Sequence, residues 1–138
     1  LEKGFGIWSA EFTQGYTPGM TGMDRWIDWE KEEFIGQAAA IKERDGNGPA
    51  QKLVMLEIDA DDADASGYEP VWNNDSLVGF VTSGGYGHTL KKSLAMALVN
   101  NDLANENQKL KVHVVGVEKD ATVIQASPYD PEGKVMRV

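Results

Sequence analysis

A glycine-rich stretch, VTSGGYGHTLKKSLAMALV at residues 81–99, is the first place in this sequence where chemistry could be expected. A phosphate-binding P-loop requires Lys and then Ser or Thr directly after its second glycine, but His88 stands there. A dinucleotide fingerprint would need glycine where Leu90 stands, and a nucleophile elbow around Ser83 would need glycine where Val81 stands. The segment therefore predicts a turn between two strands, since glycine tolerates left-handed or crowded backbone.

Ligands for a metal ion are scarce. The chain has no cysteine and only two histidines, His88 and His113, so we expect no transition-metal site. Residues 62–67, DADASG, match the first half of a calcium-binding loop. However, Asn73 replaces the glutamate expected at the twelfth position and Pro70 occupies the ninth. We interpret this segment as a solvated acidic loop.

Aromatic side chains gather near the N-terminus, and all but one of the four tryptophans lie within the first 29 residues. The cluster comprises Phe5, Trp8, Phe12, Tyr16, Trp26 and Trp29. Such rings pack against one another or against a flat ligand. The sequence leaves both interpretations open: packing of this segment onto the rest of the fold, or the wall of a heteroaromatic binding site.

Composition narrows the class of partner. The chain has 138 residues and a net charge of −9, with 22 acidic against 13 basic residues. This balance disfavours binding to nucleic acids or anionic membranes. No apolar run approaches the roughly 20 residues of a spanning helix, and the N-terminus lacks a signal-peptide pattern. We expect a cytoplasmic protein. Because the sequence starts with Leu1 rather than Met, we also expect it to be a piece of a longer protein.

The strongest break in the chain is DGNGP at residues 45–49, and it predicts two parts. Residues 1–49 form a partly helical N-terminal arm, and residues 50–138 a C-terminal barrel domain. In the arm, Thr17 and Pro18 are typical of a helix start. Residues 26–29 suggest a strand, and FIGQAAAIKER after them a helix of about two turns.

The second part shows short runs with a period of two residues, which is typical of strands. KLVMLEID is one strand, EPVW and SLVGFVTS form a hairpin, and SLAMALV is another strand. In KLKVHVVGV, alternate residues from Leu110 to Val114 share one face, and a tight turn at residues 118–120 leads to the last strand. We predict a mainly β fold, a small barrel of about six short antiparallel strands.

Several segments, in this order, resemble the C-terminal part of the glycine cleavage T-protein (aminomethyltransferase) family. They are LEKGFGIW, TPGMTGMDRW, DWEKEEFIGQAA, VGFVTSGGYGHTLKKSLAMALV and SPYDPEGKVMRV. The form SGGYGHTLKKSLA, with EPVW before it, looks most like the folate-binding halves of dimethylglycine and sarcosine dehydrogenases. A branch of iron–sulfur maintenance proteins has cysteine where this chain has Glu33, which disfavours that branch.

The resemblance implies a parent enzyme that passes a one-carbon unit from a small methylated amine or aminomethyl donor to tetrahydrofolate, with FAD in an upstream domain if the parent is a dehydrogenase. The family's catalytic carboxylates lie upstream, so we expect no catalytic residue here and no activity of the isolated chain. Residues 1–49 would then be a remnant of the folate-binding domain. The resemblance suggests Trp8, Tyr129 and Arg137 as folate-binding residues, although the family usually has Tyr at the Trp8 position, so only stacking would survive there. The alternative function is a non-catalytic barrel module that mediates domain packing.

Overall fold

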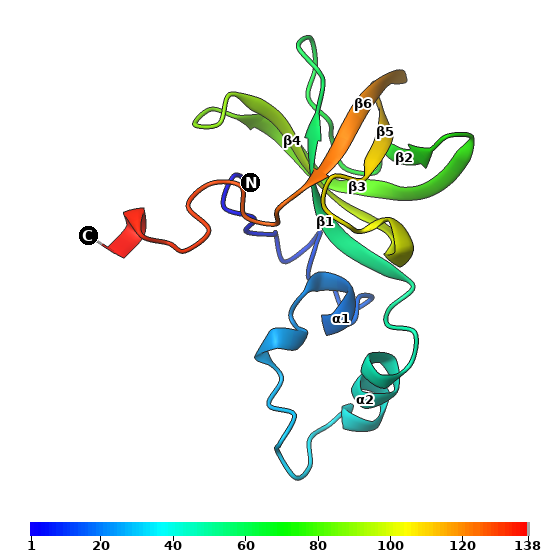
Figure 1. Cartoon of the computed structure of the whole chain (residues 1–138), viewed down its shortest axis with the longest axis vertical. Helices are drawn as coiled ribbons and strands as arrows, with labels where there is room; N and C mark the ends of the chain where they lie inside the picture. The colour runs from blue at the N-terminus through cyan, green and yellow to red at the C-terminus, as the bar shows by residue number, and fades with distance from the viewer. Residues whose placement is uncertain (138) are drawn as a thin grey trace.

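The fold is a closed antiparallel β-barrel of six strands with short helices before it (Figure 1). The computed structural model describes residues 1–137. Around the barrel the strands follow the order β1-β4-β3-β2-β5-β6. Their bounds are β1 (Gln51–Ile58), β2 (Pro70–Asn73), β3 (Ser76–Gly87), β4 (Lys92–Asn100), β5 (Lys109–Val114) and β6 (Val117–Ile124). The mainly β fold predicted from the period-two pattern is thus confirmed.

The barrel interior is filled by small and branched apolar side chains, as expected for a barrel of this size. Leu110, Val112 and Val114 of β5 all point inward, as their alternation predicted. The remaining buried members of this cluster are Val54, Leu56, Ile58, Ala65, Val71, Val78, Val81, Ala95, Ala97, Val99, Ala121 and Val123. The alternation therefore determines which face of each strand builds the core.

Strand β4 is buried on both of its faces, which explains why SLAMALV reads as a continuous apolar run. Its inward residues belong to the main core, whereas Leu94 and Met96 form a second cluster with Met55 on the outer surface. Partly buried residues of β1, β6, the β3–β4 turn and the N-terminus pack on this second cluster: Leu1, Leu53, Leu90 and Ile124. Part of the outer barrel wall is thus a packing surface for the preceding segment.

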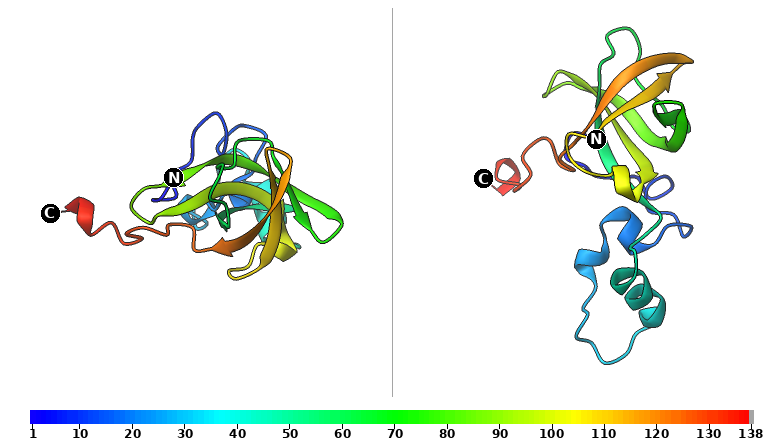
Figure 2. Two further views of the ribbon diagram at one scale, coloured as in Figure 1. Left: turned by 90° about the horizontal axis from the view of Figure 1, so that it is seen from above. Right: turned by 45° about the vertical axis from the view of Figure 1, so that its right-hand side comes forward.

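The arm contains helix α1 (Pro18–Thr21), 3-10 turn η1 (Asp24–Trp26) and helix α2 (Gln37–Asp45), and it lies beside the barrel (Figure 2). The Thr17 hydroxyl accepts a hydrogen bond from Met20 N at 3.3 Å, as its predicted capping position requires. The predicted strand at residues 26–29 is wrong, since this segment is the end of η1 followed by a bend and a turn. A closed barrel has its strand edges paired already, so a further strand has nothing to pair with.

The glycine-rich segment does not form the predicted turn. It is the end of β3, which pairs with β4 as far as Gly87, and the turn comes after it at residues 88–91. Lys91 takes the left-handed conformation there, with φ of 57°. Glycine is needed in this part of β3 because a neighbouring backbone lies close to it: a Cβ on Gly84 would lie 2.2 Å from the carbonyl oxygen of Ala65. The loop containing Ala65 crosses this end of the barrel and needs a strand without a side chain beneath it.

The β5–β6 turn also differs from the prediction. Residues 118–120 lie inside β6, and the turn is formed by Val115 and Gly116, with φ values of 49° and 80°. Two positive φ angles match the right-handed twist of a two-residue hairpin. Val115 is strained in this conformation, and its backbone N–H is bound by the Glu69 carboxylate at 2.7 Å. Sequence reasoning missed the turn because valine is a poor turn residue.

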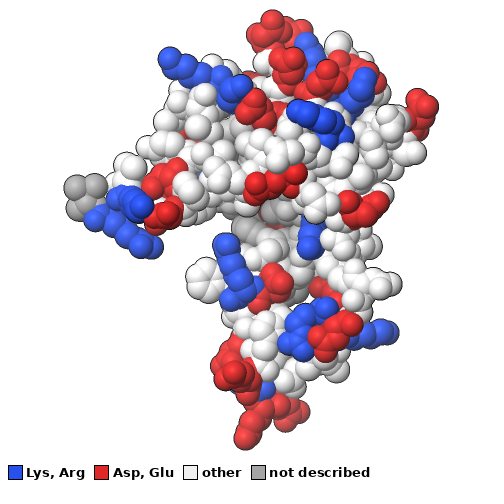
Figure 3. All heavy atoms as spheres, viewed as in Figure 1, with Lys and Arg blue, Asp and Glu red and all other residues white. Residues whose placement is uncertain are grey.

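The remaining regular elements are 3-10 turns η2 (Asn101–Leu103) and η3 (Val135–Arg137), the latter in the C-terminal tail. Within residues 1–137, no helix is long and apolar enough to cross a membrane. In Figure 3 acidic and basic side chains lie close together over the upper part of the molecule, while acidic side chains gather at the lower end of the arm.

Candidate functional site

The turn that carries Trp8 is the most exposed aromatic feature of the arm. Ala10 N and Glu11 N both donate to the carbonyl of Ile7, at 3.1 and 2.9 Å, and this closes a single helical turn. Trp8 stands on that turn with 80% of its surface exposed, and Phe5 and Ile7 beside it are also exposed. The turn thus presents an indole ring outward, where it can stack on a flat group.

Glu11 anchors this turn to the barrel and was missed by sequence reasoning. It is fully buried, one of only two polar residues in the buried class among the described residues. Its Oε2 accepts from Ile7 N at 2.6 Å, and its Oε1 accepts from the Ser83 hydroxyl at 2.5 Å. The only hint in the sequence is a lone acid flanked by an alanine and an aromatic, which does not reveal a partner in strand β3.

The tail after β6 is bound to the N-terminus. Tyr129 N donates to the Glu2 carbonyl at 3.0 Å, and Lys3 Nζ binds both the carbonyl and the carboxylate of Asp130. The Asp130 carboxylate also accepts from Lys134 N at 2.7 Å. Burial acts to raise the pKa of Asp130, but the hydrogen bonds from Lys3 and from backbone N–H groups outweigh it, so the pKa lies below its ordinary value. Tyr129 is therefore held beside residues 1–4.

The three predicted folate-binding residues occupy different surroundings. Trp8 is exposed on the arm, Tyr129 is half-buried in the tail, and Arg137 is exposed on η3. A backbone hydrogen bond joins Tyr129 to Glu2 of the N-terminal segment, whereas the tail that ends in η3, drawn in red in Figure 1, projects away from the barrel. The described residues thus bring Tyr129 to the arm and leave Arg137 apart from it.

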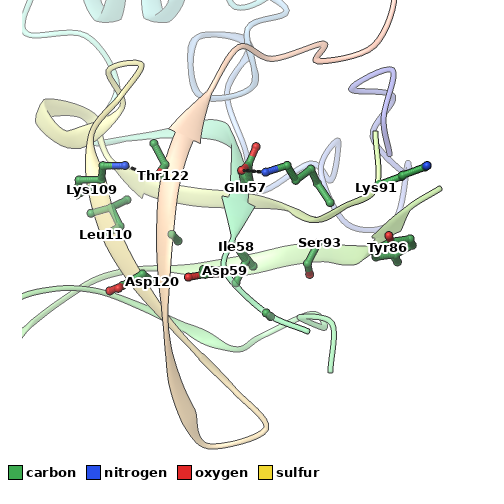
Figure 4. A pocket seen from close by; sticks show the side chains of 13 residues that line it. Glu57, Ile58, Asp59, Tyr86, Lys91, Ser93, Lys109, Leu110, Asp120 and Thr122 are labelled. Atoms are coloured by element: carbon green, nitrogen blue, oxygen red, sulfur yellow. Dashed lines mark hydrogen bonds and ion pairs between the residues drawn. The ribbon is translucent and has the colours of Figure 1, made fainter. Parts of the chain in front are cut away.

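A polar groove of about 690 Å³ lies where β1 ends and β4 begins, and Figure 4 shows its lining. Lys92 binds Glu57 at 2.7 Å, which raises the pKa of the Lys92 ammonium. Lys109 donates to the Thr122 hydroxyl at 2.8 Å on the other side. Both lysine ammonium groups are thus engaged by neighbouring side chains of the barrel.

The aspartates of the acidic loop and both histidines contact neighbouring side chains of the protein. Asp62 binds Lys119 at 2.7 Å, whereas Asp64 accepts from Ser93 at 2.7 Å, so the two carboxylates are engaged by different partners. His113 stacks on a tryptophan with ring centroids 5.4 Å apart, and His88 meets a tyrosine edge-on at 5.1 Å. Within residues 1–137, no group of three or more potential ligands is placed to hold a metal ion.

Comparison with known proteins identifies the domain. Residues 51–130 match the family described as the glycine cleavage T-protein C-terminal barrel domain. The chain belongs to this family. It is 34% identical to mitochondrial dimethylglycine dehydrogenase of Rattus norvegicus over 91% of this chain and 15% of that protein. It is 33% identical to an aminomethyltransferase of Synechocystis over 97% of this chain and 36% of that protein.

A solved structure agrees on the fold of this T-protein barrel. Aminomethyltransferase T of Bartonella henselae superposes with a TM-score of 0.83 at 22% identity, covering 94% of this chain and 36% of the other. The likeness includes most of the arm as well as the barrel. In each of these relatives the chain spans well under half of the protein, so it corresponds to only a part of them.

Proposed function

We propose that this chain is the C-terminal part of a tetrahydrofolate-dependent aminomethyltransferase or of a dimethylglycine or sarcosine dehydrogenase, an enzyme that passes a one-carbon unit from an amine to tetrahydrofolate. The observation that carries the proposal is the share of this chain that the similarity covers. Relatives with these names match 91% and 97% of the chain, so they match the arm together with the barrel. The arm is where an exposed ring is held on a defined turn. The cellular location stays a prediction, since the rat relative bears a mitochondrial name.

The side-chain chemistry of Trp8, Tyr129 and Arg137 supports separate contacts with a folate. The Trp8 indole supplies an apolar face of the size that a pterin or a benzoyl ring stacks on. Tyr129 stands on a tail segment that the N-terminus holds in place. The Arg137 guanidinium is exposed and suits a carboxylate of the glutamate end. Tetrahydrofolate would supply the nitrogen atoms that receive the one-carbon unit, and this chain would bind and orient it.

Catalysis is assigned to residues outside this chain. This assignment is supported by the family resemblance, in which the catalytic carboxylates lie upstream of the part that this chain matches. FAD, if the parent is a dehydrogenase, would likewise be bound upstream, and we assign no residue here to it. The 138-residue chain alone should therefore form no methylenetetrahydrofolate from tetrahydrofolate and dimethylglycine or sarcosine. Product formed by the chain alone would contradict this assignment.

A structural module that mediates domain packing is the second candidate, and the exposed apolar residues of the arm favour it. Phe5, Ile7, Trp26 and Ile35 are 56% to 104% exposed. Phe5 and Ile7 stand within three residues of Trp8, and exposed apolar side chains gathered in this way are typical of a surface that another domain covers. In this function Trp8 would contribute to packing and not to ligand binding.

Two tryptophan variants separate the candidates in the longer protein that we propose contains this chain. Trp8→Ala should weaken tetrahydrofolate binding by about five- to tenfold, because a stacking surface is lost. Trp26→Ala is the matched control: Trp26 is 73% exposed in the same arm and should leave the dissociation constant unchanged. Anaerobic calorimetric titration measures both. Unchanged folate binding in Trp8→Ala, with a lowered melting temperature of the longer protein, would favour the packing module.

A further inference from the structure

The buried carboxyl group of Glu11 accepts hydrogen bonds from both the arm and the barrel. It is 0% exposed, yet the ion pairs among the described residues do not include it. Burying such a group is costly unless it is hydrogen-bonded. Its two acceptor oxygens are used by two donors from distant parts of the chain, the Ile7 N–H and the Ser83 hydroxyl. The carboxyl group therefore acts as a bridge between the arm and the barrel.

The arm side of this bridge fixes the residue just before Trp8. Ile7 donates its N–H to the Glu11 side chain and accepts from the Glu11 N–H through its carbonyl. Gly6 allows this close approach, since a Cβ there would lie 2.8 Å from the Cβ of Glu11 and 2.9 Å from the Phe12 ring. Both peptide groups that flank Ile7 are thus held by one residue, and Trp8 follows directly.

The barrel side depends on an irregularity in β3. The pairing of β3 with β4 shifts register between Val81 and Ser83, so that Val81 faces Ala97 and Ser83 faces Met96. Ala97 belongs to the inner core and Met96 to the outer cluster. Without the bulge, the alternation of the strand would aim Ser83 into the barrel. The bulge instead turns the hydroxyl outward to Glu11, a typical use of such irregularities.

We propose that Glu11 is a positioning residue: it fixes the turn of residues 7–10 on the barrel wall so that the Trp8 ring is presented in one orientation to a flat ligand. The proposal rests on the proposed function for the identity of that ligand, a reduced folate. The bridge itself is independent of it. Glu11 does not touch the ligand, and it acts through Ile7 on the ring that does.

Fluorine NMR of the chain labelled with 5-fluorotryptophan tests the bridge without any ligand. Trp8→Phe assigns the Trp8 resonance, and the Trp26 resonance is an internal control from the same arm. In Glu11→Ala the Trp8 resonance should narrow and move towards that of free 5-fluorotryptophan, while the Trp26 resonance stays in place. Ser83→Ala should cause the same change to a smaller extent. The single variant Glu11→Gln should keep the wild-type spectrum, because its amide oxygen can accept from the Ile7 N–H and its NH₂ group can donate to the Ser83 hydroxyl.

Folate titration of the longer protein supplies the second measurement. Glu11→Ala should weaken tetrahydrofolate binding by about as much as Trp8→Ala, roughly five- to tenfold, and adding it to Trp8→Ala should cost little more. Glu11→Gln should bind as the wild type does. An unchanged Trp8 resonance in Glu11→Ala, with the barrel still folded by its amide spectrum, would overturn the positioning role. If instead the wild type bound no folate, the proposed function would fail while the fluorine spectra would still decide the bridge.

Discussion

The barrel and the arm are stabilised by different means. The barrel closes six strands around a core of aliphatic residues, and each strand pairs with a neighbour on both sides. The arm has short helices whose residues are all at least partly exposed, and it is attached by polar contacts such as Glu11–Ser83 and Lys3–Asp130 together with the packing of Leu1 on the outer cluster. Stability therefore resides in the barrel, while the arm presents apolar rings outward from a few fixed points.

The largest effect should come from the barrel core. Leu56 is fully buried in β1, and Leu56→Ala should lower the free energy of unfolding by about 2–5 kcal/mol, because transfer energy is lost and a cavity remains. The control in the arm is Trp26→Ala, which removes a larger side chain at a site that is 73% exposed. This variant should change the free energy of unfolding by less than about 0.5 kcal/mol. Chemical denaturation of both variants measures the difference. Equal losses would show that the arm contributes to the cooperative core.

A smaller effect should separate two neighbouring glycines. In Gly84→Ala the added Cβ meets the Ala65 carbonyl at 2.2 Å, and either the strand or the crossing loop must shift. We expect a loss of about 1–3 kcal/mol. In Gly85→Ala the nearest atom is a methyl group of Leu1 at 3.9 Å, and the backbone is extended strand, so stability should stay equal or rise slightly. Thermal melts distinguish the pair, and a similar loss in both would contradict the crowding at Gly84.

Sequence reasoning succeeded where local alternation alone determines structure. Burial follows the period of the strands, so the six strands and the inward face of β5 could be predicted. The run of β4 could be recognised as a strand, but only the structure shows that Leu1, Leu90 and Ile124 pack on the cluster at its outer face. The two turns were misplaced because GGYG has the composition of a turn, whereas Val115 has not. In both cases a contact distant in sequence overrides local preference.

The candidate site was less accessible to the sequence. Trp8 was selected through the family resemblance, and the structure adds that its ring is exposed on a closed turn. Glu11 could not be selected, since its partner Ser83 is 72 residues away and reaches it only through a β-bulge. Tyr129 and Arg137 stay predictions, as does the boundary between the arm and the barrel near residue 50. Sites that depend on non-local polar contacts leave little trace in composition or period.

The smallest expected effect concerns the contacts of Lys3 with Asp130, which join the N-terminal segment to the C-terminal tail and which we call the clip. The folded-state pKa of Asp130 lies below its ordinary value of 3.8, so the clip stabilises fully above that value and weakens as the pH falls through the folded-state pKa. Amide resonances of Tyr129, Lys134 and Val135 should therefore shift in acid, before the barrel unfolds. Asp130→Asn should give the acid-like positions already at pH 6, because asparagine tolerates the φ of 47° at this residue but cannot form the ion pair with Lys3. The melting temperature should hardly change, since the clip lies outside the barrel core. If these amides moved only together with those of β1 and β4, the tail would be part of the cooperative barrel, and the contrast between the two regions would not extend to the C-terminus.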